Sequence, residues 1–305
     1  MRWRLIGLAL LASLTTAQTG ASARQEVDAP ETVVVTGNRP SREEARREAF
    51  QFVRRMGVAN GERPAARWED GICPRVLGLA PAHARFVEKR LRSIAAAAEV
   101  PVARTPCRTN IGMLFTSDGP GTMRTVAARS PRRLAEVPAA LRPALLDGPA
   151  PVRWWYSTER RGRHGEPLAN LEPPFVTGNG SSPGQVLPGN GDTQIMSQYG
   201  SSIVSTQSIR VLTGATVVVD VNRAAGRPLD AVADYAALVA LAEVRPGGAP
   251  DGSILALFEG ETAARELTAR DRAFLRALYR LPLDRQARQH RSRLAGEVAA
   301  VAAGR

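Results

Sequence analysis

The 305-residue sequence predicts an α+β fold in which a small mixed sheet packs on helices, preceded by a mobile N-terminal arm. Apolar, β-prone runs at 110–116, 152–158 and 209–221 predict the strands. Apolar residues recur at helical spacing in 81–98 and 228–244, which predicts helices with a buried face. The apolar fraction of 44% is ordinary for a globular chain.

The first 23 residues have the order of segments that is typical of a secretory signal peptide. Arg2 and Arg4 precede an apolar run at 5–14, and Ala21-Ser22-Ala23 supplies a cleavage signal of small residues. The apolar run is too short to cross a bilayer as a helix, which needs roughly 20 residues. We therefore expect cleavage near Ala23, a periplasmic or secreted mature chain, and no transmembrane segment in it. An uncleaved anchor is the alternative.

Residues 24–64 are predicted to form a flexible arm with a short strand and a helix. Its β-prone segment, 31–39, contains Val33, Val34, Val35 and Thr36. This segment resembles the TonB box near the N-terminus of TonB-dependent outer-membrane receptors. The resemblance implies a TonB-type partner, to whose sheet the segment would add its backbone as a strand. A simple edge strand or a flexible arm is the alternative.

The main domain is predicted to span 65–305. Before it, Ser41 and Glu44 have the spacing of a capping box, which predicts a helix that ends near Met56. Residues 57–64 then have the composition of a linker, so the boundary is placed at Ala65.

Within the domain, the helix at 81–98 is expected to turn five apolar residues toward the core: Phe86, Val87, Leu91, Ile94 and Ala98. Thr213-Gly214-Ala215 interrupts the 209–221 run and predicts the turn of a hairpin. Pro138 and Pro143 are expected to interrupt a helix at 131–146. Further predicted elements are a long loop at 166–201, a short helix at 253–258, a helix with Thr268 as N-cap, and a basic helix from about Asp284.

Cys73 and Cys107 are the two cysteines of the chain. In an oxidising compartment, an even pair of cysteines in one domain is expected to form a disulfide. A catalytic thiol is the alternative, but no histidine lies close to either cysteine in the sequence.

The formal net charge of +12 does not predict a nucleic-acid partner. Lys89 is the only lysine, so nearly all of the basic charge is arginine, and with the abundant alanine this indicates a codon bias of the genome. The arginines are spread along the chain with acids nearby, which is typical of a solvated surface. Attraction to an anionic membrane or cell-wall surface is the alternative.

The predicted strands and the helix at 228–244 are followed by Gly252-Ser253-Ile254-Leu255, Leu267-Thr268, Asp271 and the run 275–279. This order resembles an uncharacterised family of bacterial secreted proteins with a zincin-like metallopeptidase fold. The resemblance extends over about 65–281 and implies a zincin-like mixed sheet packed on helices. In that family the helix after the strands carries an HExxH- or HExxQ-type motif.

The zinc motif is missing from this chain. Zinc ligands at i and i+4 must project from one helical face, with a glutamate between them as base. The aligned positions are Tyr235-Ala236-Ala237-Leu238-Val239, and no two of His83, His164 and His290 lie within one helical turn. We therefore expect no zinc and no cofactor. The resemblance then implies a pseudo-metallopeptidase domain that binds or scaffolds an envelope protein or peptide, rather than an enzyme.

A candidate polar cluster consists of Asp220, Asp230, Asp234 and Arg210. Paired carboxylates can act as acid and base, so an alternative function is a hydrolase with a carboxylate site and no zinc. Asp230 and Asp234 are more simply explained as residues that cap their helix and pair with arginines. A third possible function is that of an accessory partner in TonB-dependent uptake.

Trp154, Trp155 and Tyr156 are a candidate aromatic platform for a sugar or peptide. Side chains alternate between the two faces of a strand, so at least one of these rings is expected in the core.

Overall fold

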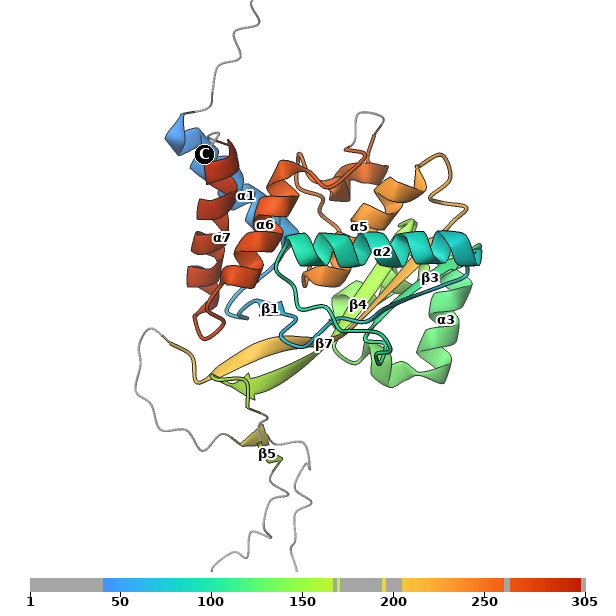
Figure 1. Ribbon diagram of the computed structural model, residues 1–305, viewed down its shortest axis with the longest axis horizontal. Helices are drawn as coiled ribbons and strands as arrows, with labels where there is room; N and C mark the ends of the chain where they lie inside the picture. Colours follow the sequence, from blue (N-terminus) through green and yellow to red (C-terminus); the bar gives the residue numbers. More distant parts are fainter. Residues whose placement is uncertain (1–40, 167–168, 171–193, 196–204, 261–263, 303–305) are drawn as a thin grey trace, which may run out of the picture. The chain divides into compact units, whose positions relative to one another are not determined.

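A computed structural model describes residues 41–166, 169–170, 194–195, 205–260 and 264–302 (Figure 1). These residues belong to one compact unit, Arg39–Arg305. The predicted signal peptide and the TonB-box-like segment lie outside the described residues.

The centre of the fold is strand β7 (Ser208–Asp220). Along one edge it pairs in parallel with β1 (Ala66–Arg67) and then with β3 (Ile111–Thr116), which in turn pairs in parallel with β2 (Pro74–Leu77). Along its other edge it pairs antiparallel with β4 (Val152–Gly162), an edge strand of the sheet. The predicted mixed sheet is thus confirmed.

The predicted hairpin at 209–221 is wrong, because both of its runs belong to the single strand β7. Gly214, the expected turn residue, lies in the strand opposite Ser157, and the register of β4 shifts between Ser157 and Thr158. A Cβ atom at position 214 would lie 3.3 Å from the Cβ of Ser157. Glycine at an irregularity between two paired strands gives the same local signal as glycine in a turn.

Helices α2 (Pro81–Ala97) and α5 (Leu229–Leu241) lie against each other, and α5 also packs on β4 and β7 (Figure 1). Helix α2 buries Val87, Leu91 and Ala95, whereas Phe86, which was expected in the core, is exposed. Positions 87, 91 and 95 follow each other at four-residue spacing, and position 86 lies at the margin of that face.

Helix α5 is buried on all sides from Ala231 onward. Every residue from 231 to 241 is buried, because the helix is enclosed by α2, the sheet, the 3₁₀ helix η3 (Ile254–Phe258) and α6 (Ala269–Arg280). The predicted helix at 228–244 is confirmed but ends earlier, since Ala242 is extended. A helix that is apolar all round belongs in the interior of a domain.

Helices α1 (Arg42–Met56) and α6 both pack against α7 (Ala287–Ala302) (Figure 1). The capping box of Ser41 and Glu44 is confirmed. Because Phe52, Val53 and Met56 are part of the main hydrophobic core, α1 belongs to the folded domain. The predicted boundary at Ala65 therefore moves to the N-terminal side of α1.

The opposite face of the sheet carries a second, smaller core beneath α3 (Gly119–Arg129) and α4 (Arg142–Asp147). The expected helix at 131–146 is broken near its prolines into η1 (Pro131–Leu134), η2 (Ala139–Leu141) and α4. Helix α3 escaped the sequence predictions because Gly119-Pro120-Gly121 is typical of a turn. Here Pro120 lies in the first helical turn, and Asp118 caps the helix by accepting a bond from the Gly121 amide at 2.8 Å.

The disulfide between Cys73 and Cys107 is confirmed and links the segments that precede β2 and β3. Among the described helices, none combines the length and apolar character needed to cross a bilayer. A separate two-stranded sheet consists of β5 (Ala169–Asn170) and β6 (Gln194–Ile195).

Candidate functional site

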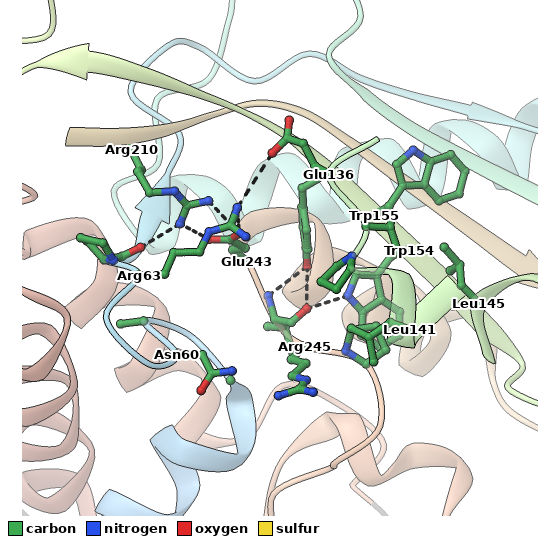
Figure 2. A pocket seen from close by; sticks show the side chains of 18 residues that line it. Asn60, Arg63, Glu136, Leu141, Leu145, Trp154, Trp155, Arg210, Glu243 and Arg245 are labelled. Carbon is green, nitrogen blue, oxygen red and sulfur yellow. Dashed lines mark hydrogen bonds and ion pairs between the residues drawn. The ribbon is translucent and has the colours of Figure 1, made fainter. Parts of the chain in front are cut away.

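A pocket of about 270 Å³ lies beside edge strand β4 (Figure 2). Five stretches of the sequence line it: the turn after α1, the segment from η1 to α4, the aromatic part of β4, Arg210 of β7, and the residues after α5. The lining is apolar on one side and charged on the other (Figure 2). The apolar side includes Val137, Pro138, Leu141, Leu145, Trp154, Trp155 and Tyr156, and the polar residues are Asn60, Arg63, Glu136, Arg210, Glu243 and Arg245.

The charged side is organised around Glu243. Arg210 extends from β7 and donates two hydrogen bonds to the Glu243 carboxylate, at 2.7 and 2.9 Å, and a third to the Pro64 carbonyl at 2.8 Å. Arg63 approaches the same carboxylate at 3.0 Å. The Arg210 and Glu243 side chains are 8% and 17% exposed, so this two-pronged ion pair is largely shielded from water.

Glu136 extends this network along the lining of the pocket. Its carboxylate accepts hydrogen bonds from the Thr158 amide at 2.7 Å and from the Thr158 hydroxyl at 2.6 Å, and Arg63 lies 3.9 Å away. Both carboxylates of the pocket are therefore engaged by donors from the chain itself.

The aromatic residues of β4 hold the segment after α5 in place. The Tyr156 hydroxyl lies 2.7 Å from the carbonyls of Val239 and Ala242 and accepts a hydrogen bond from the Val244 amide at 3.0 Å. Burial raises the pKa of Tyr156 well above its usual value, so the hydroxyl stays protonated. Trp154 Nε1 donates to the Val244 carbonyl at 2.9 Å. These bonds fix the backbone on either side of Glu243.

Trp154 and Trp155 point to opposite faces of the sheet and are 7% and 5% exposed. Trp154 belongs to the main core, where its ring meets Tyr235 edge-on at 6.0 Å, and Trp155 belongs to the smaller core. The expectation that at least one ring is in the core is confirmed. The predicted platform is thus not a row of exposed rings, and the aromatic side chains instead form one wall of the pocket.

Two polar side chains of the pocket have no hydrogen-bond partner among the described residues, namely those of Asn60 and Arg245, and both are exposed. The Arg245 backbone is fixed by its amide, which donates to the Met56 carbonyl at 2.9 Å. The end of α1 and the segment after α5 approach each other so closely that position 57 must be glycine. A Cβ atom at Gly57 would lie 2.4 Å from the Cβ of Arg245. Gly57 also has a φ of 73°, which ends the helix.

Only Arg210 of the predicted polar cluster lines this pocket. Asp234, 1% exposed, pairs with Arg90 on α2, with one oxygen–nitrogen distance of 2.9 Å, and accepts a bond from the Leu267 amide at 2.8 Å. Asp220 accepts bonds from the Gly119, Asn222 and Arg223 amides. Asp230 is exposed, and no hydrogen bond or ion pair between described residues joins any two of these four side chains.

The positions that align with the zinc motif, 235–239, are buried within α5. Among the described residues, no group of three His, Cys, Asp or Glu side chains lies close enough to hold a metal ion. His290 is buried, accepts a hydrogen bond from the Ala65 amide at 3.1 Å and faces the Pro282 carbonyl at 3.0 Å, while His83 and His164 are exposed.

Sequence reasoning missed five polar residues of the pocket: Asn60, Arg63, Glu136, Glu243 and Arg245. They are scattered over three segments and form no motif. Gly57 is the one local signal near them, because a glycine at this position indicates the end of α1.

Val33, Val34, Val35 and Thr36 lie outside the described residues, so a TonB-type partner stays a prediction. Comparison with family models, with curated proteins and with solved structures found no match to this chain.

Proposed function

We propose that this chain is an exported, non-catalytic binding domain derived from a zincin-like metallopeptidase, and that it binds a peptide or small amphipathic molecule in the pocket beside β4. The observation that carries the proposal is the state of the two carboxylates in that pocket. Glu243 is engaged by two arginines and Glu136 by Thr158, an arrangement that is typical of carboxylates that hold segments of a fold together. The apolar wall, by contrast, is open to a ligand.

One feature supports the derivation from a metallopeptidase, and a second supports the loss of its metal site. Helix α5 packs against β7 and β4, which is where the resemblance expects the helix with the zinc motif. At 235–239 this helix has a tyrosine, alanines, a leucine and a valine, all buried, so its surface contributes packing and no ligands.

The proposed location outside the cytoplasm rests on the signal-like segment at 1–23. The disulfide between Cys73 and Cys107 is compatible with it, since oxidising compartments favour such bonds.

The first test is a measurement of zinc content and peptide hydrolysis on purified protein with its disulfide intact. We expect no stoichiometric zinc and no turnover. Bound zinc together with peptide cleavage would falsify the non-catalytic part of the proposal.

The second test concerns the pocket. A panel of short peptides and small aromatic molecules is screened for binding by thermal shift and calorimetry. Leu141→Trp fills the apolar wall and should abolish binding, whereas Leu77→Trp, at a residue that is 55% exposed and outside this pocket, should leave it unchanged. Equal binding by the two variants would place the ligand elsewhere.

A further inference from the structure

We infer that the ligand of this pocket is a carboxylate joined to an apolar or aromatic group, and that the carboxylate binds to Arg245 and Asn60. This inference rests on the proposed function, because it names the class of ligand for the same site.

The apolar wall sets the size of the ligand. A volume of about 270 Å³ is just below the range of most small-molecule pockets, roughly 300–1,000 Å³. It therefore suits one aromatic ring or branched aliphatic group rather than a large ligand. Leu141 and Leu145 come from η2 and α4, and the two tryptophans come from β4, so such a group would be enclosed by rigid elements (Figure 2).

The charges of the pocket favour an anion. Three arginines and two glutamates line it, and the glutamates are already engaged by Arg210, Arg63 and Thr158. The positive charge that remains is that of Arg245, whose guanidinium has no partner among the described residues. A cationic ligand would meet this guanidinium without a free carboxylate to balance it.

Arg245 and Asn60 have the donors that a carboxylate needs. A guanidinium presents paired N–H groups that match the two oxygens of a carboxylate, and such charge-assisted bonds are stronger than neutral ones. The Asn60 amide adds N–H donors, and in Figure 2 both side chains lie on the same side of the Arg63–Glu243 pair. The backbone at 244–245 is held by hydrogen bonds to Met56 and Trp154, so it loses little conformational freedom when a ligand binds.

The inference is tested by calorimetry on the disulfide-bonded mature chain with three probes of one shape. These are hydrocinnamate, its neutral amide hydrocinnamide, and the cation phenethylamine. We expect hydrocinnamate to bind about tenfold more tightly than hydrocinnamide, as one charge-assisted interaction predicts, and phenethylamine to bind most weakly.

Arg245→Gln should weaken the binding of hydrocinnamate about tenfold and leave hydrocinnamide unchanged. The matched control is Arg54→Gln, which removes the same charge from an exposed residue near the end of α1 that does not line the pocket. A loss that Arg54→Gln reproduces would reflect net charge alone and would overturn the assignment to Arg245.

Two further probes distinguish the sources of such a carboxylate. A short peptide that ends in phenylalanine with a free C-terminus is compared with the same peptide as its C-terminal amide. If the free peptide binds more tightly than hydrocinnamate, the ligand is a peptide end, and if it binds less tightly, the ligand is a free organic acid. Either result supports the ligand class, provided that hydrocinnamate binds more tightly than hydrocinnamide.

The outcomes separate this inference from the proposed function. If acid and amide bind equally well to the wild-type protein, the preference for a carboxylate is wrong, but the binding pocket stands. If no peptide or aromatic probe binds at all, both are overturned.

Discussion

Glu243 accepts two hydrogen bonds from Arg210, at 2.7 and 2.9 Å, although 33 positions separate the two residues in the sequence. Arg210 lies in the central strand and Glu243 follows the buried helix α5. Their ion pair therefore fixes the end of α5 against the sheet and forms the charged side of the pocket. Arg63 adds a second positive charge at 3.0 Å and connects the turn after α1 to the same point.

The Arg210–Glu243 pair is expected to stabilise the fold. Arg210→Met leaves a largely buried carboxylate without its main partner, and breaking a buried pair in this way costs about 3 kcal/mol. The free energy of unfolding is measured by urea titration. The control is Arg124→Met, which breaks a pair with Asp147 whose side chains are 60% and 63% exposed, and should change stability by less than about 1 kcal/mol. Equal effects of the two substitutions would show that the Arg210 pair contributes no more than a surface contact.

Asp234 is expected to be a structural residue, not an acid catalyst. Asp234→Asn removes the charge that Arg90 pairs with, in a side chain that is 1% exposed, and should lower the stability by about 2–3 kcal/mol. For a domain of this size, that corresponds to a fall in melting temperature of roughly 5–10 °C. Asp230→Asn, one turn earlier at an exposed position, is the control and should leave the melting temperature within about 2 °C. Similar losses of stability in both variants would show that the buried pair of Asp234 with Arg90 contributes no more than an exposed carboxylate.

Stability is expected to fall as the pH drops below about 6.5, the ordinary pKa of histidine, because of His290. Burial lowers the pKa of His290, and Arg293 and Arg67 add repulsion, whereas a hydrogen bond to Pro282 opposes the shift. The unfolded chain therefore takes up a proton at a higher pH than the native chain. Since the unfolded state then binds more protons, acid favours unfolding in this window.

The measurement is urea unfolding between pH 7 and pH 5. His290→Gln retains an acceptor and a donor but does not titrate, so its stability should depend less on pH than that of the wild type. His83→Gln, at an exposed histidine, should retain the wild-type dependence. If the stability of His290→Gln falls with pH as steeply as that of the wild type, another titrating group causes the dependence.

Gly78 is expected to be intolerant of any side chain. It follows β2 with a φ of 84°, and a Cβ atom there would lie 1.9 Å from the Phe115 carbonyl oxygen. Gly78→Ala therefore combines strain of about 1 kcal/mol with a clash against the backbone, and should destabilise by more than about 2 kcal/mol.

Gly226 separates the two contributions. Its φ is 80°, yet a Cβ atom there would meet nothing within 4 Å. Gly226→Ala should therefore cost only about 1 kcal/mol, the strain of the left-handed backbone. Chemical denaturation of both variants gives the difference, and a similar cost for both would rule out the clash at Gly78.

The sequence predicted best where the signal is local. The capping box of Ser41 and Glu44 lies within one helical turn, and the apolar repeat of α2 identifies Val87 and Leu91 as core residues. Such patterns depend on backbone bonds and side-chain spacing inside one element. The signal at Gly214 failed because a turn and a strand irregularity both favour glycine, and the partner strand decides between them.

The sequence by itself determined the class of the fold, most of its helices and strands, and the pairing of the two cysteines, since these follow from periodicity, caps and composition. The tertiary structure alone decided that α1 joins the core, that 208–220 is one strand, and that Arg63, Arg210 and Glu243 meet beside two tryptophans. The physical reason is that an ion pair or a pocket forms between side chains brought together by the packing of α5 on the sheet. The residues that flank either member of such a pair in the sequence do not indicate which residue is its partner.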